Sequence, residues 1–151
     1  MPEHWVLDTN AVLDWLVFDD PAMRVVAAGL IEGRALWAHT RAMLDELADV
    51  LSREPVWRRA RAPSDELLRR VGDAATRHGV LLPAAEACEL ECADPDDQMF
   101  IDLALQAGAR LLVTRDKALL AFARRAGSHG LRIARPAELA AELAAETAGP
   151  A

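Results

Sequence analysis

Four carboxylates fall within the nine residues of the stretch DPDDQMFID, residues 94–102, where a helix is expected to begin. A helix dipole favours an acid in its first turn by only a few tenths of a kcal/mol, and crowded carboxylates repel one another. Helix capping therefore accounts for one acid here but not for the crowding. Carboxylate oxygens without Cys or His among them suit a hard cation such as Mg²⁺ or Mn²⁺. The stretch therefore predicts a cation site as well as a helix start.

The elements that would position these acids follow from alternating short apolar runs and helical stretches, which predict an α/β fold with a parallel sheet. We expect strands at 4–7, 35–38, 80–82, 111–114 and 131–134. Helices are expected at 11–17, 21–33, 41–53, 65–79, 96–108, 117–127 and 136–147, with a connection or short helix between the third and fourth. No linker or repeat divides the chain, so we predict one domain over residues 1–147 and a disordered tail at 148–151.

Two further acids stand at strand ends. Asp8 directly follows the first strand, and Asp116 lies two residues beyond the fourth. Binding sites of open parallel sheets form outside the carboxyl ends of the strands, especially where the connections turn in opposite directions. If these two strands are neighbours at such a point, both acids face one crevice. Taken alone, Asp8 is better explained as an N-cap for the helix after it.

Two acids border the apolar faces of their helices. Glu46 adjoins the apolar stripe of helix 41–53, where burial of an acid is costly unless it meets a cation or hydrogen-bond donors. A salt-bridged surface acid remains an alternative for Glu46. Asp97 shares the core side of its helix with Ile101, so it is expected to point inward, whereas Asp102 lies off that face and is expected to be solvated.

The charge balance is acidic, with 24 acids against 17 bases and a net charge of −7, which taken alone argues against a nucleic-acid binder. The bases are unevenly spread, however, because residues 52–63 hold four arginines and Trp57. We predict that the segment 53–61, with Arg58 and Arg59, contacts a substrate backbone or a partner chain. A solvated connection with Trp57 buried is the alternative. A bound cation would reverse the sign at the acids and admit a polyanion.

No apolar run approaches the roughly 20 residues that span a bilayer, and no signal peptide is evident, so a cytoplasmic protein without membrane contact is expected. Cys88 and Cys92 lack a nearby ligand set for zinc and are expected to be buried or half-buried free thiols. The four histidines form no paired motif and are expected at the surface; they are His4, His39, His78 and His129.

Four segments in order resemble the PIN-domain nucleases, in particular the VapC-like toxins of bacterial toxin–antitoxin systems. They are WVLDTNAVLDWL, MLDELADVL, DPDDQMFIDLALQAGA and LLVTRDKALL, within residues 4–125. The resemblance implies a three-layer α/β/α sandwich with a central parallel sheet. It also implies a Mg²⁺- or Mn²⁺-dependent endoribonuclease that hydrolyses RNA, pairs with an antitoxin protein and forms a homodimer.

Carried over by position, the family's catalytic and metal-binding acids correspond to Asp8, Glu46, Asp97 and Asp116. Asp94 resembles an additional acid that precedes proline in part of the family. The residues that correspond to supporting polar groups are Asn10 and Thr114. Ala118 departs from the pattern, because relatives often carry a further acid there. Arg115 stands where one subgroup has glycine, and we assign it to substrate binding together with Arg58 and Arg59.

Three other functions can be weighed against this resemblance. The domain could have lost activity and serve only for interaction, for example by holding a basic peptide in its crevice. A phosphatase of the haloacid-dehalogenase type also starts from an acid after its first strand, but it needs a proton-donating acid two residues later, where this chain has Asn10. A dinucleotide enzyme would need a glycine-rich first turn, which DTNAV does not supply.

Overall fold

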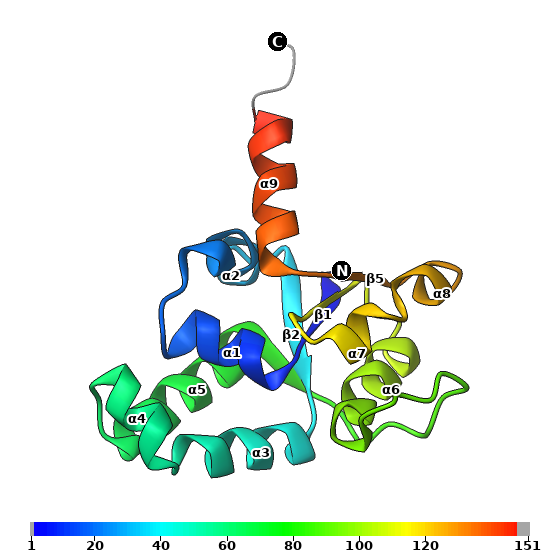
Figure 1. Cartoon of the computed structure of the whole chain (residues 1–151). Helices are drawn as coiled ribbons and strands as arrows, with labels where there is room; N and C mark the ends of the chain where they lie inside the picture. The colour runs from blue at the N-terminus through cyan, green and yellow to red at the C-terminus, as the bar shows by residue number, and fades with distance from the viewer. Residues whose placement is uncertain (1, 148–151) are drawn as a thin grey trace.

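A five-stranded parallel sheet forms the middle of the computed structural model, which describes residues 2–147 (Figure 1). The strands are β1 (Glu3–Leu7), β2 (Ala35–His39), β3 (Gly79–Leu81), β4 (Leu111–Val113) and β5 (Arg132–Ala134), in the spatial order β3-β2-β1-β4-β5. The expected neighbours β1 and β4 pair through Trp5 with Leu111 and Leu7 with Val113. This confirms the parallel sheet and the adjacency on which the proposed crevice depends.

Helices cover both faces of the sheet. They are α1 (Thr9–Leu16), α2 (Arg24–Ile31), α3 (Arg41–Leu51), α4 (Glu54–Ala60), α5 (Ser64–His78), α6 (Gln98–Gln106), α7 (Lys117–Leu120), α8 (Ala123–Gly127) and α9 (Pro136–Thr147), with short 3₁₀ turns η1 (Pro21–Met23) and η2 (Pro95–Asp97). Helices α1 to α5 lie on one side of the sheet and α6 to α8 on the other (Figure 1). The expected three-layer α/β/α arrangement is therefore confirmed. The expected tail at 148–151 lies outside the described residues.

The expected helix bounds differ from the observed ones at several places, among them residues 21–33, which form the 3₁₀ turn η1 followed by α2. The helix expected over 117–127 is divided into α7 and α8, and the one expected over 96–108 begins with the 3₁₀ turn η2. The arginine-rich segment forms the short helix α4, which ends at Arg61 in the left-handed conformation. Within residues 2–147, no helix is long and apolar enough to cross a membrane.

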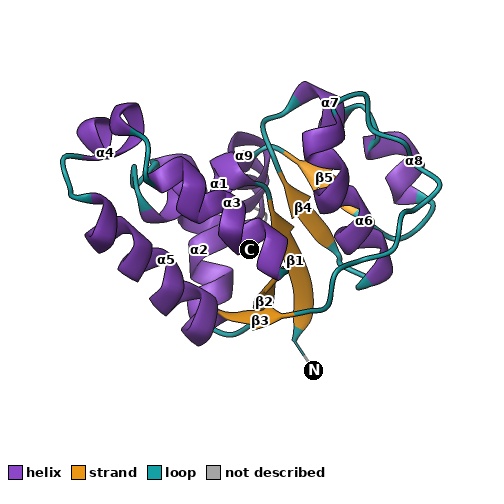
Figure 2. Cartoon of the chain, turned by 90° about the horizontal axis from the view of Figure 1, so that it is seen from below, coloured by secondary structure: helices purple, strands orange, loops and turns teal. Residues whose placement is uncertain are grey.

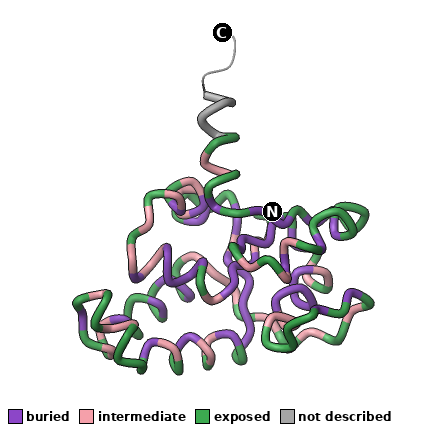
Figure 3. Tube along the Cα trace, in the orientation of Figure 1, coloured by how far each residue is buried: buried purple, intermediate pink, exposed green. Residues whose placement is uncertain are grey.

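Alternate strand residues feed two separate cores, because successive side chains of a strand point to opposite faces of the sheet. Leu7, Trp37 and Val113 belong to the core beneath α1 to α5. Val6, Ala38 and Leu112 belong to the core beneath α6 to α8. The buried backbone therefore runs through the centre of the molecule, and exposure is concentrated on the outer helices and loops (Figure 3). Both cores hold the central strands rigidly from opposite sides.

The chain changes direction across the sheet between β1 and β4. From β1 it proceeds through β2 to β3 on one side, and it then returns to build β4 and β5 on the other side. Helices α1 and α3 lie on one side of the carboxyl ends of β1 and β4, and helices α6 and α7 lie on the other side (Figure 2). Such a reversal opens a crevice at the carboxyl ends of the two central strands. The acids that follow β1 and β4 are located at this edge.

Two expectations about burial are wrong. Asp102 is buried rather than solvated, because the segment between β3 and α6 folds back over α6 and donates the Cys88 backbone N–H to its carboxylate at 3.0 Å. His39 is buried rather than exposed, because it ends β2 beneath α5 and its Nε2 lies 3.3 Å from the Ala75 carbonyl. Gly79 is required beside it, since an added Cβ would stand 2.8 Å from that nitrogen. Both errors arise from tertiary contacts that a helix or strand pattern does not contain.

Candidate active site

Asp8 lies at the carboxyl end of β1 and is almost completely buried. Its Oδ1 accepts the backbone N–H of Ala11 at 2.8 Å, so Asp8 is the N-cap of α1 as one sequence interpretation proposed. Its Oδ2 accepts the hydroxyl of Thr114 at 2.5 Å. Capping thus uses only one carboxylate oxygen, and the second oxygen is directed to the end of β4. The capping and site interpretations of Asp8 are compatible.

Thr114 joins the ends of the two central strands. It is fully buried at the end of β4, where its hydroxyl donates to Asp8 and accepts the backbone N–H of Asp116 at 2.9 Å. Asp116 in turn caps α7 by accepting the N–H of Ala118 at 2.7 Å. The Thr114 hydroxyl therefore holds both the Asp8 carboxylate and the backbone of Asp116. The departure at Ala118 leaves this capping bond intact, since the bond uses its backbone.

Asp97 reaches the same crevice from the α6 side. Its neighbour Asp94 caps η2 by accepting the N–H of Asp96 at 3.0 Å, whereas the Asp97 side chain makes no capping bond. The Asp97 Oδ2 atom is buried and has no hydrogen-bond partner among residues 2–147. The carboxyl of Asp116 is its neighbour, and two carboxyls satisfy each other only by sharing a proton. Helix capping explains Asp8, Asp94 and Asp116, but it does not explain Asp97.

Burial and mutual repulsion raise the pKa values of two of these acids. Burial, followed by contact with and charge on Asp116, raises the pKa of Asp97 to about 7, with further contributions from Asp94 and Asp8. Burial also raises the pKa of Asp8 to about 6, against the opposing hydrogen bonds from Thr114 and Ala11. Perturbed carboxyls in a cleft are typical of functional sites, although structural networks also produce them. Asp8, Asp97 and Asp116 therefore act electrostatically as one cluster.

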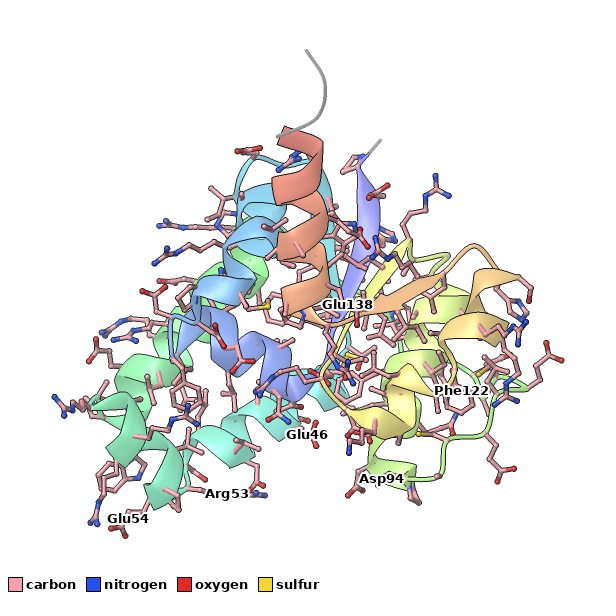
Figure 4. All side chains as sticks on the ribbon, turned by 45° about the horizontal axis from the view of Figure 1, so that its top comes forward. Glu46, Arg53, Glu54, Asp94, Phe122 and Glu138 are labelled. Carbon is pink, nitrogen blue, oxygen red and sulfur yellow. The ribbon has the colours of Figure 1, made fainter. Side chains whose placement is uncertain are left out.

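Glu46 stands apart from that cluster. It is half-buried on α3, and it accepts the hydroxyl of Thr9 at 2.5 Å. Glu46 contributes to neither of the two raised pKa values. In Figure 4 Glu46 projects from α3, whereas Asp94 lies beside α6 on the other side of the sheet. Thr9 follows Asp8 in the chain, so its hydroxyl links Glu46 to the start of α1.

Asn10 and the arginines assigned from sequence lie around the acids. Asn10 is exposed, and within the described residues it has no hydrogen-bond partner for its side chain. The Arg115 Nη2 lies 2.9 Å from the buried Asp14 carboxylate. Arg58 pairs with Glu54 within α4, and the Arg59 guanidinium lies 4.1 Å from the centre of the Phe18 ring. Of the three arginines, Arg115 is the one whose charge acts on the buried acid Asp8.

Three polar residues important for this geometry did not stand out in the sequence. Thr9 could have been noticed as a hydroxyl immediately after Asp8. Asp14 could have been noticed as an acid among apolar residues of α1. Gln98 bonds through its amide to the backbone of Leu90 and Cys92 at 2.8 and 2.6 Å, and so holds the segment before η2 against α6. Because the hydrogen bonds of Gln98 depend on how the loop folds, no periodic pattern in the sequence predicts them.

The carboxylate oxygens of the site are donor atoms that a divalent cation prefers, although the acids approach one another in pairs and not as a larger group. Within residues 2–147, no group of three or more acidic, His or Cys side chains stands close enough as it lies to hold a metal ion. The cluster nevertheless offers only carboxylate oxygens, and the buried Asp97 Oδ2 has no other described partner. A divalent cation would remove the repulsion that raises the pKa of Asp97. We conclude that these residues fit a hard cation.

Comparison with known proteins gives an independent assignment. The family described as PIN domain matches residues 4–118, which include all four acids named above for catalysis. Among solved structures, the chain resembles the crystal structure of VapBC2 from Rickettsia felis bound to a DNA fragment from their promoter, with a TM-score of 0.62 and 15% sequence identity. That match covers 87% of this chain and 98% of the other, and at this identity it shows the fold alone. No curated protein matches the sequence. By the family match, the chain belongs to the PIN domain family, whose members are generally nucleases.

Proposed function

We propose that this PIN domain, spanning residues 1–147, is an endoribonuclease that depends on Mg²⁺ or Mn²⁺ and hydrolyses phosphodiester bonds of RNA. The observation that carries the proposal is the half-buried Asp97, whose buried Oδ2 has no hydrogen-bond partner among the described residues and whose carboxyl faces other acids. A carboxylate in that position costs folding stability, so a role in stability does not explain it. PIN domains generally use divalent metal ions, which agrees with an all-oxygen donor set.

The proposed metal ligands are Asp8, Asp97 and Asp116, with Asp94 and Glu46 completing the set. When bound, Mg²⁺ or Mn²⁺ lowers the pKa of water and stabilises negative charge on phosphate oxygens. Thr114 holds Asp8 and the backbone of Asp116 in place. Thr9 holds Glu46 at the opposite wall. We assign Asn10, which is exposed at the start of α1, a supporting role beside the acids.

We assign substrate binding to Arg58, Arg59 and Arg115. Trp57, Arg58 and Arg61 are among the residues that line a surface hollow of about 370 Å³. Arginine pairs with phosphate and an aromatic face stacks on bases, so this hollow suits a single strand. The ion pair of Arg58 with Glu54 is exposed and weak, and an RNA phosphate can replace it.

We further propose that the protein is the toxin of a toxin–antitoxin pair, acts in the cytoplasm, and forms a homodimer. The likeness to VapBC2 from Rickettsia felis supports an antitoxin partner for this chain. An antitoxin arginine inserted among the acids would neutralise the site by charge pairing. This partner is distinguishable from RNA, because its binding should suppress both metal binding and cleavage.

The proposed activity is tested by RNA cleavage with Mn²⁺, with Mg²⁺ and with a chelator, for the wild type and Asp8→Asn. The substitution preserves shape and the capping oxygen but removes a charge, so folding should stay intact while cleavage is lost. Cleavage by the wild type only with the cation is the expected result. Equal activity of both proteins, or activity unaffected by chelator, excludes the metal-dependent nuclease. A folded wild type without cleavage under any condition favours the inactive interaction domain.

A further inference from the structure

Asp14 is a buried acid that the proposed mechanism does not use. It lies on α1, six residues after Asp8, and only 5% of its surface is exposed. Its carboxylate caps no helix, in contrast to nearby Asp20, which caps η1. Within the described residues its one side-chain partner is Arg115, whose Nη2 lies 3.1 Å from Oδ1 and 2.9 Å from Oδ2. The Asp14 carboxylate is therefore buried, and among the described residues the Arg115 guanidinium alone pairs with its charge.

The ion pair between Asp14 and Arg115 does not offset the free-energy cost of burying the Asp14 carboxylate. Burial raises the pKa of Asp14 even though the adjacent Arg115 opposes that shift. Buried ion pairs are often no more stabilising than apolar residues of the same volume. The apolar neighbours Leu13 and Val17 show that α1 could carry an apolar side chain at this depth. The stability of the fold therefore does not explain an acid at position 14.

Arg115 is held at the rim of the acidic site. In the sequence, Arg115 stands between Asp116 and Thr114. The hydroxyl of Thr114 bonds the Asp8 carboxylate after β1 and the Asp116 N–H after β4. The charge of Arg115 lowers the pKa of Asp8, so the guanidinium lies near the buried acids. More than half of the Arg115 side chain remains exposed, at 55%. Among residues 2–147 the acceptor found for this side chain is Asp14, which Nη2 contacts, so Nε and Nη1 are not used by that pair. Two such donors match the oxygens of a phosphate.

We propose that Asp14 is a positioning residue, which fixes Arg115 so that its remaining N–H donors bind the RNA phosphate next to the scissile one. This inference rests on the proposed nuclease function and extends it to the substrate contact. Fixing the long arginine side chain in advance removes the entropy that substrate binding would otherwise cost. The alternative is a clamp that merely fastens α1 to the loop after β4.

The test compares kcat and KM for RNA in Mn²⁺ among wild type, Asp14→Asn, Arg115→Ala and the double variant. Each single change should raise KM roughly tenfold with little change in kcat, and the double variant should be no worse than Arg115→Ala. Arg115→Lys keeps the charge at an exposed side chain without the paired donors, and it should share most of the defect. Glu66→Gln, which breaks the exposed pair with Arg70 on α5, is the matched control and should leave KM unchanged.

RNA binding in an Asp8→Asn background separates this inference from the nuclease proposal. Fluorescence anisotropy with a labelled RNA should show the same non-additive loss of affinity for Asp14→Asn and Arg115→Ala. If the wild type does not cleave but this loss appears, the nuclease proposal fails and the positioning role stands. Cleavage with unchanged KM in Asp14→Asn, additive effects of the two changes, or a lowered unfolding free energy with unchanged RNA affinity would overturn the positioning role. Loss of function in Arg115→Ala but not in Arg115→Lys would also overturn it.

Discussion

The acidic crevice and the arginine-rich helix α4 are both highly charged, but their charged side chains lie in opposite environments. In the crevice, Asp8 is buried and Asp97 half-buried, and both stand among like charges and have raised pKa values. On α4, Arg58 is exposed and pairs with Glu54 one turn away. Exposed pairs of this kind contribute at most about 1 kcal/mol to stability. The crevice, in contrast, is arranged at the expense of stability.

This difference shows why charge density alone is a poor guide to function. Helix α4 could lose a charge with little effect on folding, because water already screens it. The crevice acids are held by specific bonds from Thr114 and by the two central strands, which a ligand-free surface would not require. We therefore assign the chemistry to the acids and a binding role to the arginines.

Asp97 and its neighbour Asp96 provide the largest expected contrast. Asp97→Asn should lower cleavage of RNA at least about a hundredfold, because cation-based stabilisation of the transition state amounts to several kcal/mol. Asp96→Asn removes the same charge from an exposed side chain in the same turn and should change cleavage less than about twofold. Rates measured at saturating Mn²⁺ decide the matter. Similar losses in both variants would show that only net charge at this helix start is important.

Asp102 tests whether a buried acid can be purely structural. Asp102→Ala should lower the free energy of unfolding by about 1–3 kcal/mol, because the Cys88 N–H and the Gln98 amide lose a buried acceptor. Asp102→Asn retains an acceptor oxygen and should cost less. Urea denaturation measures both variants. Unchanged stability in Asp102→Ala would mean that the segment before η2 is not fastened through this carboxylate.

The raised pKa of Asp97 predicts a distinct pH dependence for the cation-free protein. The folded-state pKa of about 7 exceeds the ordinary value of 3.8, so the folded state binds the proton more tightly than the unfolded chain does. This contribution to stability is complete below pH 4 and is lost as the pH rises through 7. We expect a loss on the order of 1 kcal/mol, reduced by solvent screening, and absent in Asp97→Asn. Thermal unfolding in chelator at pH 5 and pH 8 compares the two proteins, and identical pH profiles would contradict the assignment.

The smallest effect on stability is expected on α4. Charge reversal of Arg58 and Arg59 should change the free energy of unfolding by less than about 1 kcal/mol. The same double change should weaken RNA binding severalfold, more strongly at low salt, or weaken dimerisation. Anisotropy and sedimentation measure the two outcomes. If RNA affinity and oligomeric state both persist, α4 is only a connection.

Much of the fold was predictable because the signals were local. The apolar runs that predict strands act within a few residues, and the structure confirms a strand at each of the five expected places. The adjacency of β1 and β4 followed from the acids at their ends and is also confirmed. The burial of Asp102 and His39 was mispredicted, because a returning loop and the packing of α5 determine it.

The site was predictable only in part for the same reason. Asp8 and Asp116 follow strands, so their meeting depends on sheet order alone. Glu46 accepts the hydroxyl of Thr9, and no periodic pattern in the sequence reveals this contact. The pairing of Asp14 with Arg115 joins residues 101 positions apart, and residue types alone do not predict such a contact.

Direct binding of Mn²⁺ tests the central claim that the acids assemble to hold a divalent cation. Electron paramagnetic resonance of free Mn²⁺ should measure saturable binding to the wild type, a strongly weakened affinity in Asp8→Asn and Asp97→Asn, and an unchanged affinity in Asp96→Asn. The measurement needs neither the correct RNA nor an antitoxin. A wild type that binds no Mn²⁺ at millimolar concentration, or variants that all bind alike, would contradict the account.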